Sequence, residues 1–138
     1  MAYLIDTDTF SAVAKGSSAK AAQRLGALRH GEGRLSVVTL AEVAYGLAHR
    51  PVNARMQLEI DALKSALMLL PLGLNVVPHY ASLRAALRRA GTPIGPNDCW
   101  LAAHALAEGL TLVSNNEREF SRVPGLQVEN WRAACRRS

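Results

Sequence analysis

Short, largely apolar runs that alternate with helix-like stretches constrain the fold of this chain more than any other feature. Five such runs, of three or four residues each, lie at 3–5, 35–38, 74–77, 110–113 and 126–129. Runs of this length that are rich in Leu, Ile and Val are typical of strands buried on both faces. Because they alternate with helices, they predict an α/β fold with a mostly parallel five-stranded sheet flanked by helices on both faces.

The helical stretches are marked by apolar residues at helical spacing. Shorter stretches follow the first two runs, one covers 80–90, and another begins after the turn at 91–96. The chain end at 132–138 is predicted to be a helix end that frays. The longest stretch carries one apolar stripe, which is typical of a helix face packed on a core or on another helix; its members are Met56, Ile60, Leu63, Leu67 and Leu70.

The composition fits a single domain over 1–138. A chain of 138 residues that is 49% hydrophobic and 20% charged can bury one core, which argues against disorder. The uncharged segment 65–83 has membrane-spanning length, but Pro71, Gly73, Asn75 and Pro78 divide it into a helix end, a turn and a strand. We therefore predict no membrane span. Two cysteines are too few for a disulfide framework, which favours the cytoplasm.

The charge balance is basic. Sixteen Lys and Arg residues against eleven Asp and Glu residues give a net charge of +5, and all but three of the cations are Arg. Arg matches the geometry of phosphate groups, so a nucleic-acid partner is compatible with this balance. A small domain can carry the same charge for solubility alone, so charge does not decide the function.

Three acidic residues lie within core-forming sequence. Asp6 follows the first predicted strand, Glu42 is expected in the first turn of the helix after the second, and Asp98 in the first turn of a later helix. Buried carboxylates are rare unless they are paired, hydrogen-bonded or metal-bound. In an open parallel sheet these three places share one edge, where ligands bind. Oxygen ligands without a suitable Cys or His set favour Mg²⁺ or Mn²⁺ over zinc.

Each acid also has a structural explanation. Thr39 and Glu42 have the spacing of a capping box, Asp98 behind Pro96 suits the helix dipole, and Asp6 can cap its own helix. For any one residue taken alone, the structural interpretation is the stronger one. The edge that all three are expected to share favours a functional site instead.

Four sequence blocks resemble the acidic motifs of PIN-domain ribonucleases, and in particular the VapC-type toxins of bacterial toxin–antitoxin pairs. The blocks span nearly the whole chain, and their order and spacing are more specific than any one of them. They are 4–7 (LIDT), 39–46 (TLAEVAYG), 94–105 (IGPNDCWLAAHA), and 112–120 (LVSNNEREF) with 123–126 (VPGL).

The resemblance assigns roles to individual residues. It implies that Asp6, Glu42 and Asp98 hold the metal and that Ser114 orients a water. Asn116 stands where many family members have a fourth acid, and an amide adds no negative charge, so a second cation is expected to bind more weakly. Either Glu117 or Glu119 could compensate, although Ser114 and Glu117 also have capping-box spacing. Asp8 is expected near the site, or in a local cap.

The same resemblance implies an activity and partners. It implies a Mg²⁺- or Mn²⁺-dependent endoribonuclease in which a metal-activated water hydrolyses RNA. It also implies a cognate antitoxin and a homodimer, and the stripe at 56–70 is a hypothetical groove for an antitoxin helix. Arginine side chains are expected to hold the RNA backbone, although for any one of them a solvated surface charge is the stronger interpretation; the candidates are Arg84, Arg88, Arg89, Arg118 and Arg122.

Two other functions stay open at this point. Asp6-Thr7-Asp8 after an apolar strand is also how haloacid-dehalogenase-like phosphatases begin, with Asp6 as nucleophile. Against this, Phe10 stands where those enzymes usually have Thr or Val, and no suitable lysine accompanies the later acid. The second alternative is a non-catalytic binding module whose acids are structural caps. The motif order argues against such a module, whereas Asn116 is compatible with it.

Overall fold

The computed structural model describes residues 1–132, and the helix end predicted at 132–138 lies outside them apart from Arg132. Twelve helices and strands lie along this part of the chain, with one or two helices between successive strands. They are β1 (Tyr3–Ile5), α1 (Thr7–Lys15), α2 (Ala19–Gly26), β2 (Gly33–Ser36), α3 (Val37–His49), α4 (Ala54–Ala66), β3 (Met68–Leu70), α5 (Val76–Arg89), α6 (Pro96–Glu108), β4 (Thr111–Val113), α7 (Glu117–Phe120) and β5 (Val128–Glu129).

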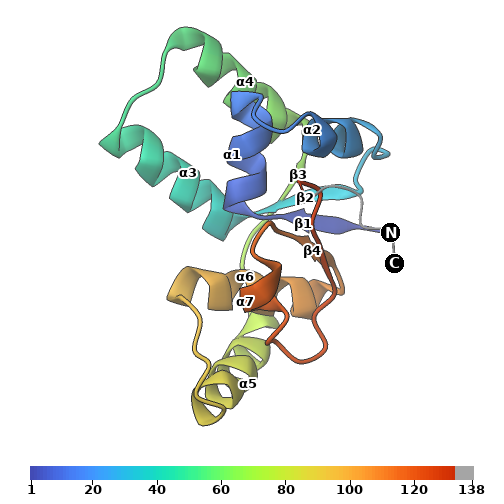
Figure 1. Cartoon of the computed structure of the whole chain (residues 1–138), viewed down its shortest axis with the longest axis vertical. Coiled ribbons are helices and arrows are strands. Elements are labelled where there is room, and N and C mark those ends of the chain that lie inside the picture. The colour runs from blue at the N-terminus through green and yellow to red at the C-terminus, as the bar shows by residue number, and fades with distance from the viewer. Residues whose placement is uncertain (133–138) are drawn as a thin grey trace.

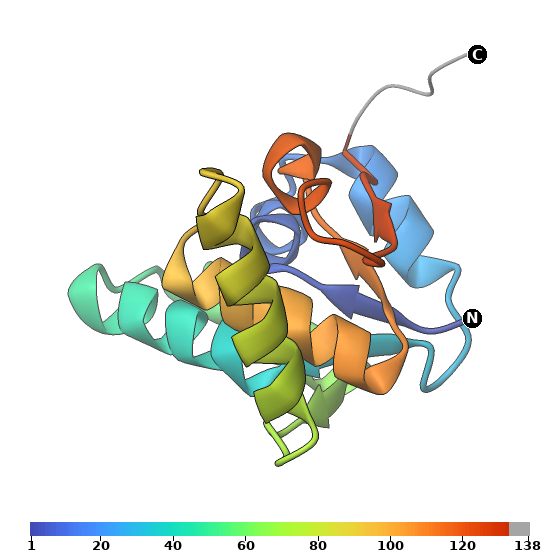
Figure 2. The ribbon, with the colours of Figure 1, turned by 90° about the horizontal axis from the view of Figure 1, so that it is seen from below.

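The five strands form one sheet in the order β3-β2-β1-β4-β5, and all four pairings are parallel. This confirms the predicted α/β architecture. Helices α1, α2 and α4 lie on one side of the sheet, and α5, α6 and α7 lie on the other (Figures 1 and 2). The strand order reverses beside β1, which pairs with β2 on one side and with β4 on the other. Ligands bind open parallel sheets outside the carboxyl ends of the strands at such a reversal.

Alternation along the strands produces two cores, one on each face of the sheet. Leu4 and Leu112 point into the core that α5 and α6 cover. Their neighbours Ile5 and Val113, together with Leu35, point into the core that α1 and α4 cover. Successive side chains of a strand face opposite ways, so strands covered on both faces must be apolar throughout. Adjacent residues of β1 and β4 therefore contact opposite layers of helices.

Two of the predicted strands are wrong in position. The second was expected at 35–38, but β2 ends at Ser36, whose hydroxyl accepts a hydrogen bond from Val38 N–H (3.1 Å) and so begins α3. The third was expected at 74–77, but β3 covers Met68–Leu70 instead. Val76 is fully buried in the first turn of α5, where Pro78 is tolerated because the first backbone N–H groups of a helix need no partner within it.

The apolar stripe at 56–70 does not stay on one helix. Helix α4 ends at Ala66, Leu67 is its C-cap, and Leu70 belongs to β3. Ile60 and Leu67 are buried in the core beneath α1 and α4, so these two residues are not part of an open groove, and a groove for an antitoxin helix along the rest of the stripe stays a prediction. The last two predicted strands are confirmed with shorter bounds, as β4 and β5.

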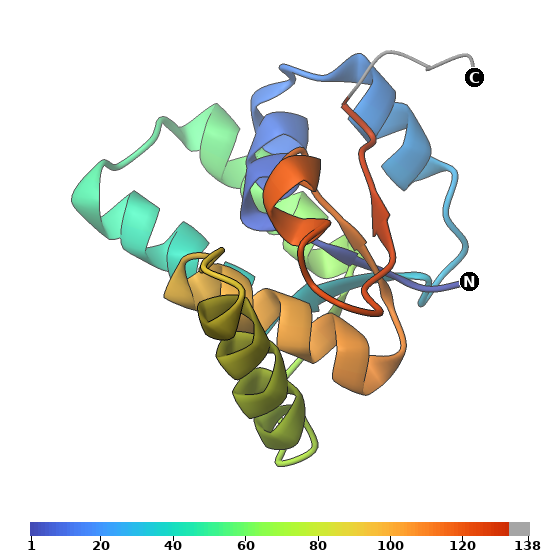
Figure 3. The same cartoon turned by 60° about the horizontal axis from the view of Figure 1, so that its bottom comes forward.

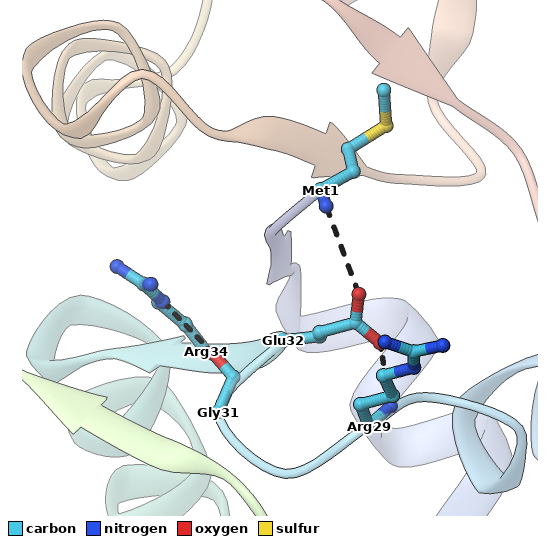
Figure 4. Close-up of polar contacts among 5 residues, drawn as sticks. All are labelled: Met1, Arg29, Gly31, Glu32 and Arg34. Atoms are coloured by element: carbon cyan, nitrogen blue, oxygen red, sulfur yellow. Dashed lines mark hydrogen bonds and ion pairs between the residues drawn. The ribbon is translucent and has the colours of Figure 1, made fainter.

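Polar contacts fix the turn that leads into β2, at the amino end of the sheet (Figure 4). Glu32 accepts a hydrogen bond from Arg29 N–H, and its other oxygen lies 3.7 Å from the amino group of Met1. Arg34 donates from Nε to the carbonyl oxygen of Gly31 (3.2 Å). These contacts hold the starts of β1 and β2 together, away from the edge where the acids lie. None of the helices over 1–132 has the length and apolar character needed to span a bilayer.

Candidate functional site

Asp6 is the first residue after β1, in the centre of the sheet, and it is only 5% exposed. Its carboxylate caps α1 by accepting Thr9 N–H (2.8 Å), and its own N–H donates to the carbonyl of Val113 (3.0 Å). Burial raises the pKa of this carboxyl group, and hydrogen bonds from Ser114 and Thr9 oppose the rise. The capping role predicted for Asp6 is therefore confirmed, and Ser114 gives it a second contact that capping does not explain.

Ser114 directly follows β4 and is fully buried. Its side chain hydrogen-bonds to Asp6, so it joins the ends of the two strands that flank the reversal of strand order. Its hydroxyl oxygen also accepts Asn116 N–H (2.9 Å). The N-cap of α7 is Asn116, so the alternative of a capping box between Ser114 and Glu117 is not found.

Glu42 lies in the second turn of α3, one turn later than expected, because the helix begins at Val37. Thr7, the first residue of α1, donates its hydroxyl to Glu42 Oε1 (2.7 Å) and so directs the carboxylate toward the end of β1. The capping box with Thr39 is absent, since Ser36 caps this helix. Thr7 is a residue whose role the sequence analysis missed, and its position beside Asp6 was the available signal.

Asp98 lies in the first turn of α6, as predicted, and is partly buried. Its pKa is raised to about 6, first by burial and then by the negative charges of Glu119, Glu42, Asp6 and Asp8. Helix α6 runs beside α3 (Figure 3), which brings its start toward Glu42. The structure therefore gathers acids from α1, α3, α6 and α7 at one edge of the sheet.

The contacts of helix α7 distinguish Glu119 from Glu117, either of which could compensate for the acid that Asn116 replaces. The side chain of Asn116 donates from Nδ2 to Glu119 Oε2 (2.6 Å), and Glu119 exerts the largest charge effect on Asp98. Glu117 instead accepts a hydrogen bond from the side chain of Asn130 (3.4 Å). Glu119 therefore belongs to the acid cluster, and Asn116 orients it rather than adding charge.

The acid cluster is not a preformed metal cage. Over residues 1–132, no group of three or more Asp, Glu, His or Cys side chains stands in an arrangement that could hold a metal ion. Three of its four carboxylates have neutral hydrogen-bond partners, with Asp6 on Thr9, Glu42 on Thr7 and Glu119 on Asn116. Like charges that are not neutralised repel, so such partners keep the carboxylates apart.

Comparison with known proteins agrees with this geometry. Residues 3–126 match the PIN domain, which is most of the chain. The chain belongs to the PIN-domain family. Within the family it is of the VapC type, since it is 35% identical over 129 residues to the tRNA(fMet)-specific endonuclease VapC of Shigella flexneri, covering 94% of this chain and 97% of that one.

Further relatives of the PIN-domain chain support the same placement. Ribonuclease VapC2 of Haemophilus influenzae strain KW20 is 41% identical over 97 residues, which cover 70% of this chain and 74% of the relative. Among solved structures, VapBC2 of Rickettsia felis, bound to a DNA fragment from its promoter, superposes with a TM-score of 0.87 at 32% identity, covering 95% and 99% of the two chains. The DNA-bound VapBC of Salmonella typhimurium superposes with a TM-score of 0.86 at 33% identity, covering 95% and 98%.

Proposed function

We propose that this PIN-domain protein is a Mg²⁺- or Mn²⁺-dependent endoribonuclease and the toxin of a toxin–antitoxin pair. The observation that carries the proposal is the convergence of four carboxylates at the reversal point of the sheet, in a chain of the VapC type. These carboxylates are Asp6, Glu42, Asp98 and Glu119. Membership of this family does not favour the alternatives of a phosphatase or a non-catalytic module.

The donor set fits a hard divalent cation. Every candidate ligand is a carboxylate oxygen, and Mg²⁺ retains several waters and binds proteins through as few as one or two carboxylates. A preformed cage is therefore not required. The pKa of Asp98 is raised to about 6, first by burial and then by the negative charges of Glu119, Glu42, Asp6 and Asp8, so a bound cation would relieve repulsion within this group. When bound, the cation would activate a water for in-line attack on phosphorus and stabilise charge on the phosphoryl oxygens.

The protein's own residues orient the carboxylates and bind the substrate. Thr7 positions Glu42, Ser114 positions Asp6, and Asn116 positions Glu119. Neutral hydrogen-bond donors behind metal-binding carboxylates fix their direction without competing for the charge. The RNA backbone would be held by exposed arginines around the site. Those candidates are Arg84, Arg88 and Arg89 on α5, with Arg118 and Arg122 in and after α7.

A cleavage assay tests the proposal. The 35% identical Shigella relative is named for tRNA(fMet), so end-labelled initiator tRNA is the first substrate to incubate with antitoxin-free protein. Defined fragments are expected with Mg²⁺ or Mn²⁺, and EDTA should reduce cleavage by about a hundredfold or more. The Asp98→Asn protein, purified in the same way, controls for contaminating ribonuclease. Equal cleavage in EDTA, or by this variant, would overturn the proposal, and phosphate release from small monoesters would restore the phosphatase.

The two glutamates of α7 provide a matched pair of variants. We expect Glu119→Gln to lower kcat by about 10- to 100-fold and to raise the Mn²⁺ concentration needed for half-maximal activity. Glu117→Gln removes the same charge two residues away and should change kcat by less than about threefold, since Glu117 faces Asn130. A manganese titration of the cleavage rate measures both. Similar losses in the two variants would show that α7 contributes only net charge.

A protein partner is part of the same proposal. The solved VapBC neighbours are toxin–antitoxin complexes, so we propose a cognate antitoxin, and a homodimer in the cytoplasm. Ile60 and Leu67 of the stripe at 56–70 are buried in the chain's own core, so the antitoxin is expected to contact other residues. Co-expression with the protein encoded beside this one, followed by co-purification, tests the partnership.

A further inference from the structure

A hollow of about 510 Å³ opens beside the acid cluster, between α3 and the start of α6. Its walls include Val37, Ala41 and Tyr45 from α3, Asn97 and Trp100 from α6, and Leu72 from the segment between β3 and α5. The hydrogen-bonded pair of Thr7 and Glu42 lines the side that faces the acids. The size is within the range of small-ligand sites, and of its lining residues the metal-binding role proposed above uses Glu42 alone.

Two aromatic side chains line the hollow in different ways. The ring of Trp100 stacks on Tyr80 with 3.9 Å between centroids and 19° between planes, so it is held rigidly. Tyr45 is 71% exposed although it is a large side chain, and its ring lies parallel to that of His49 at 5.9 Å. One face of a fixed indole is therefore occupied, while the tyrosine ring is available to a bound molecule.

The charges around the hollow limit what can bind there. Among residues 1–132, Glu42 is the only charged residue that lines it, so an anionic group such as phosphate would be repelled. The remaining walls are apolar or aromatic, except for the neutral Thr7 and Asn97. A flat, neutral group with hydrogen-bonding edges suits these walls, because the Asn97 amide can both donate and accept.

We propose that the hollow binds one unstacked nucleobase of the RNA, next to the phosphodiester that is cut. Tyr45 supplies the stacking surface and Asn97 contacts the base edge. Proteins read single-stranded RNA in this way, by splaying bases onto aromatic side chains and bonding to their edges. The inference rests on the proposed ribonuclease function and adds a specificity site to it, because the base beside Glu42 would set which bond reaches the acids.

Binding measurements test the stacking role. All variants are made in the Asp98→Asn protein, so that cleavage does not interfere, and a fluorescein-labelled single-stranded RNA of about eight nucleotides is titrated by anisotropy. Tyr45→Ala should weaken binding by about tenfold or more, whereas Tyr45→Phe should stay within about twofold. Leu74→Ala is the matched control, because Leu74 is 90% exposed but does not line the hollow.

A second measurement tests for a base in contact with Tyr45. RNAs that each lack one base are bound to the parent protein and to Tyr45→Ala. At one position, loss of the base should weaken binding to the parent by about tenfold but leave binding to Tyr45→Ala within about twofold.

Tryptophan fluorescence gives a third measurement. The chain has two tryptophans, so in Trp131→Phe the tryptophan fluorescence comes from Trp100 alone. Bound RNA should quench this fluorescence, and RNA that lacks the base at that position should not.

The outcomes separate this inference from the proposed function. If protein with Asp98 intact does not cleave RNA with Mg²⁺ or Mn²⁺, the proposed function fails. If it cleaves RNA, but Tyr45→Ala binds RNA like its Asp98→Asn parent and, made with Asp98 intact, cleaves like the unsubstituted protein, only the base site is wrong. Sedimentation of the same variants shows whether Tyr45 holds a second copy of the chain. A dimer that Tyr45→Ala converts to monomer, with no base-specific loss of RNA binding, would overturn the base site in favour of a protein interface.

Discussion

Replacing Asp98 with asparagine is expected to abolish RNA cleavage while making the metal-free protein more stable. Asp98 is central to the proposed metal site, and loss of such a ligand should reduce kcat by about a thousandfold or more, since metal-dependent activation of water accounts for several kcal/mol of transition-state stabilisation. Asparagine has nearly the same shape, so α6 should keep its position. The cleavage rate and the midpoint of urea unfolding, measured on the same preparations, check both parts.

The gain in stability follows from the direction of the pKa shift. The folded protein raises the pKa of Asp98 from 3.8 to about 6, so it favours the protonated form. The favourable contribution of that proton is complete below pH 3.8 and is lost as the pH rises through about 6. At pH 7 the ionised carboxylate therefore destabilises the metal-free protein by about 1–2 kcal/mol, after allowance for partial exposure. Asparagine carries no such charge.

A matched control is available on α4. Asp61 is exposed, and its Oδ1 lies 3.9 Å from Lys64 Nζ. Asp61→Asn should therefore leave the cleavage rate unchanged and should change the free energy of unfolding by no more than about 0.5 kcal/mol. The contrast with Asp98→Asn should grow between pH 4 and pH 7 and shrink when Mn²⁺ is added, because the cation neutralises the cluster only where Asp98 is present. If Asp98→Asn is less stable than the parent at pH 7, the cluster is not electrostatically strained.

Truncating Phe120 to alanine is expected to lower the free energy of unfolding by about 3–5 kcal/mol. Phe120 is 1% exposed at the end of α7, and it packs into the core that contains Leu4 and Leu112. Phe120 is the buried side chain of this four-residue helix, which also carries Glu119. A loss of this size is a large share of the total stability of a small domain. Urea denaturation followed by circular dichroism measures it.

The control for Phe120 is an apolar side chain that makes no comparable contact. Leu58 on α4 is 69% exposed, so Leu58→Ala should stay within about 0.5 kcal/mol of the parent. Phe120→Leu keeps most of the buried area and should cost about 1–2 kcal/mol. The rate of RNA cleavage by the Phe120→Leu protein, measured at a temperature at which this variant is folded, tests whether Glu119 keeps its position. A small loss on Phe120→Ala would mean that α7 is held by its backbone contacts rather than by its ring.

The layers of the fold were predictable from the sequence, but two strand positions were not. Alternating runs and helices predict a parallel sheet because burial on both faces requires apolar strands. The runs at 35–38 and 74–77 mix Val with polar residues and fit the start of a buried helix as well as a strand. The structure resolves this by capping α3 at Ser36 and burying Val76 within α5. The strand Met68–Leu70 could not be recognised in the sequence, because no turn residue separates it from α4.

The location of a site residue was predictable from the sequence where that residue directly follows a strand. Asp6 and Ser114 follow strands, so their location at the sheet edge comes from topology alone. The contacts of Thr7 with Glu42 and of Asn116 with Glu119 depend on the angle between elements, which local sequence does not encode. The choice of Glu119 over Glu117 and the hollow beside Tyr45 are likewise three-dimensional properties. Whether these side chains bind metal remains a prediction.

The central place of β1 has a consequence for the order of synthesis. β1 is synthesised before the other four strands of the sheet, whereas its neighbour β4 and the helix that carries Glu119 come late in the order of elements. A nascent protein therefore presents Asp6 and Glu42 without their later companions for most of translation. If the mature protein destroys RNA, the messenger and tRNAs that produce it are spared by its incomplete copies until β4 and α7 have been synthesised and have joined the sheet.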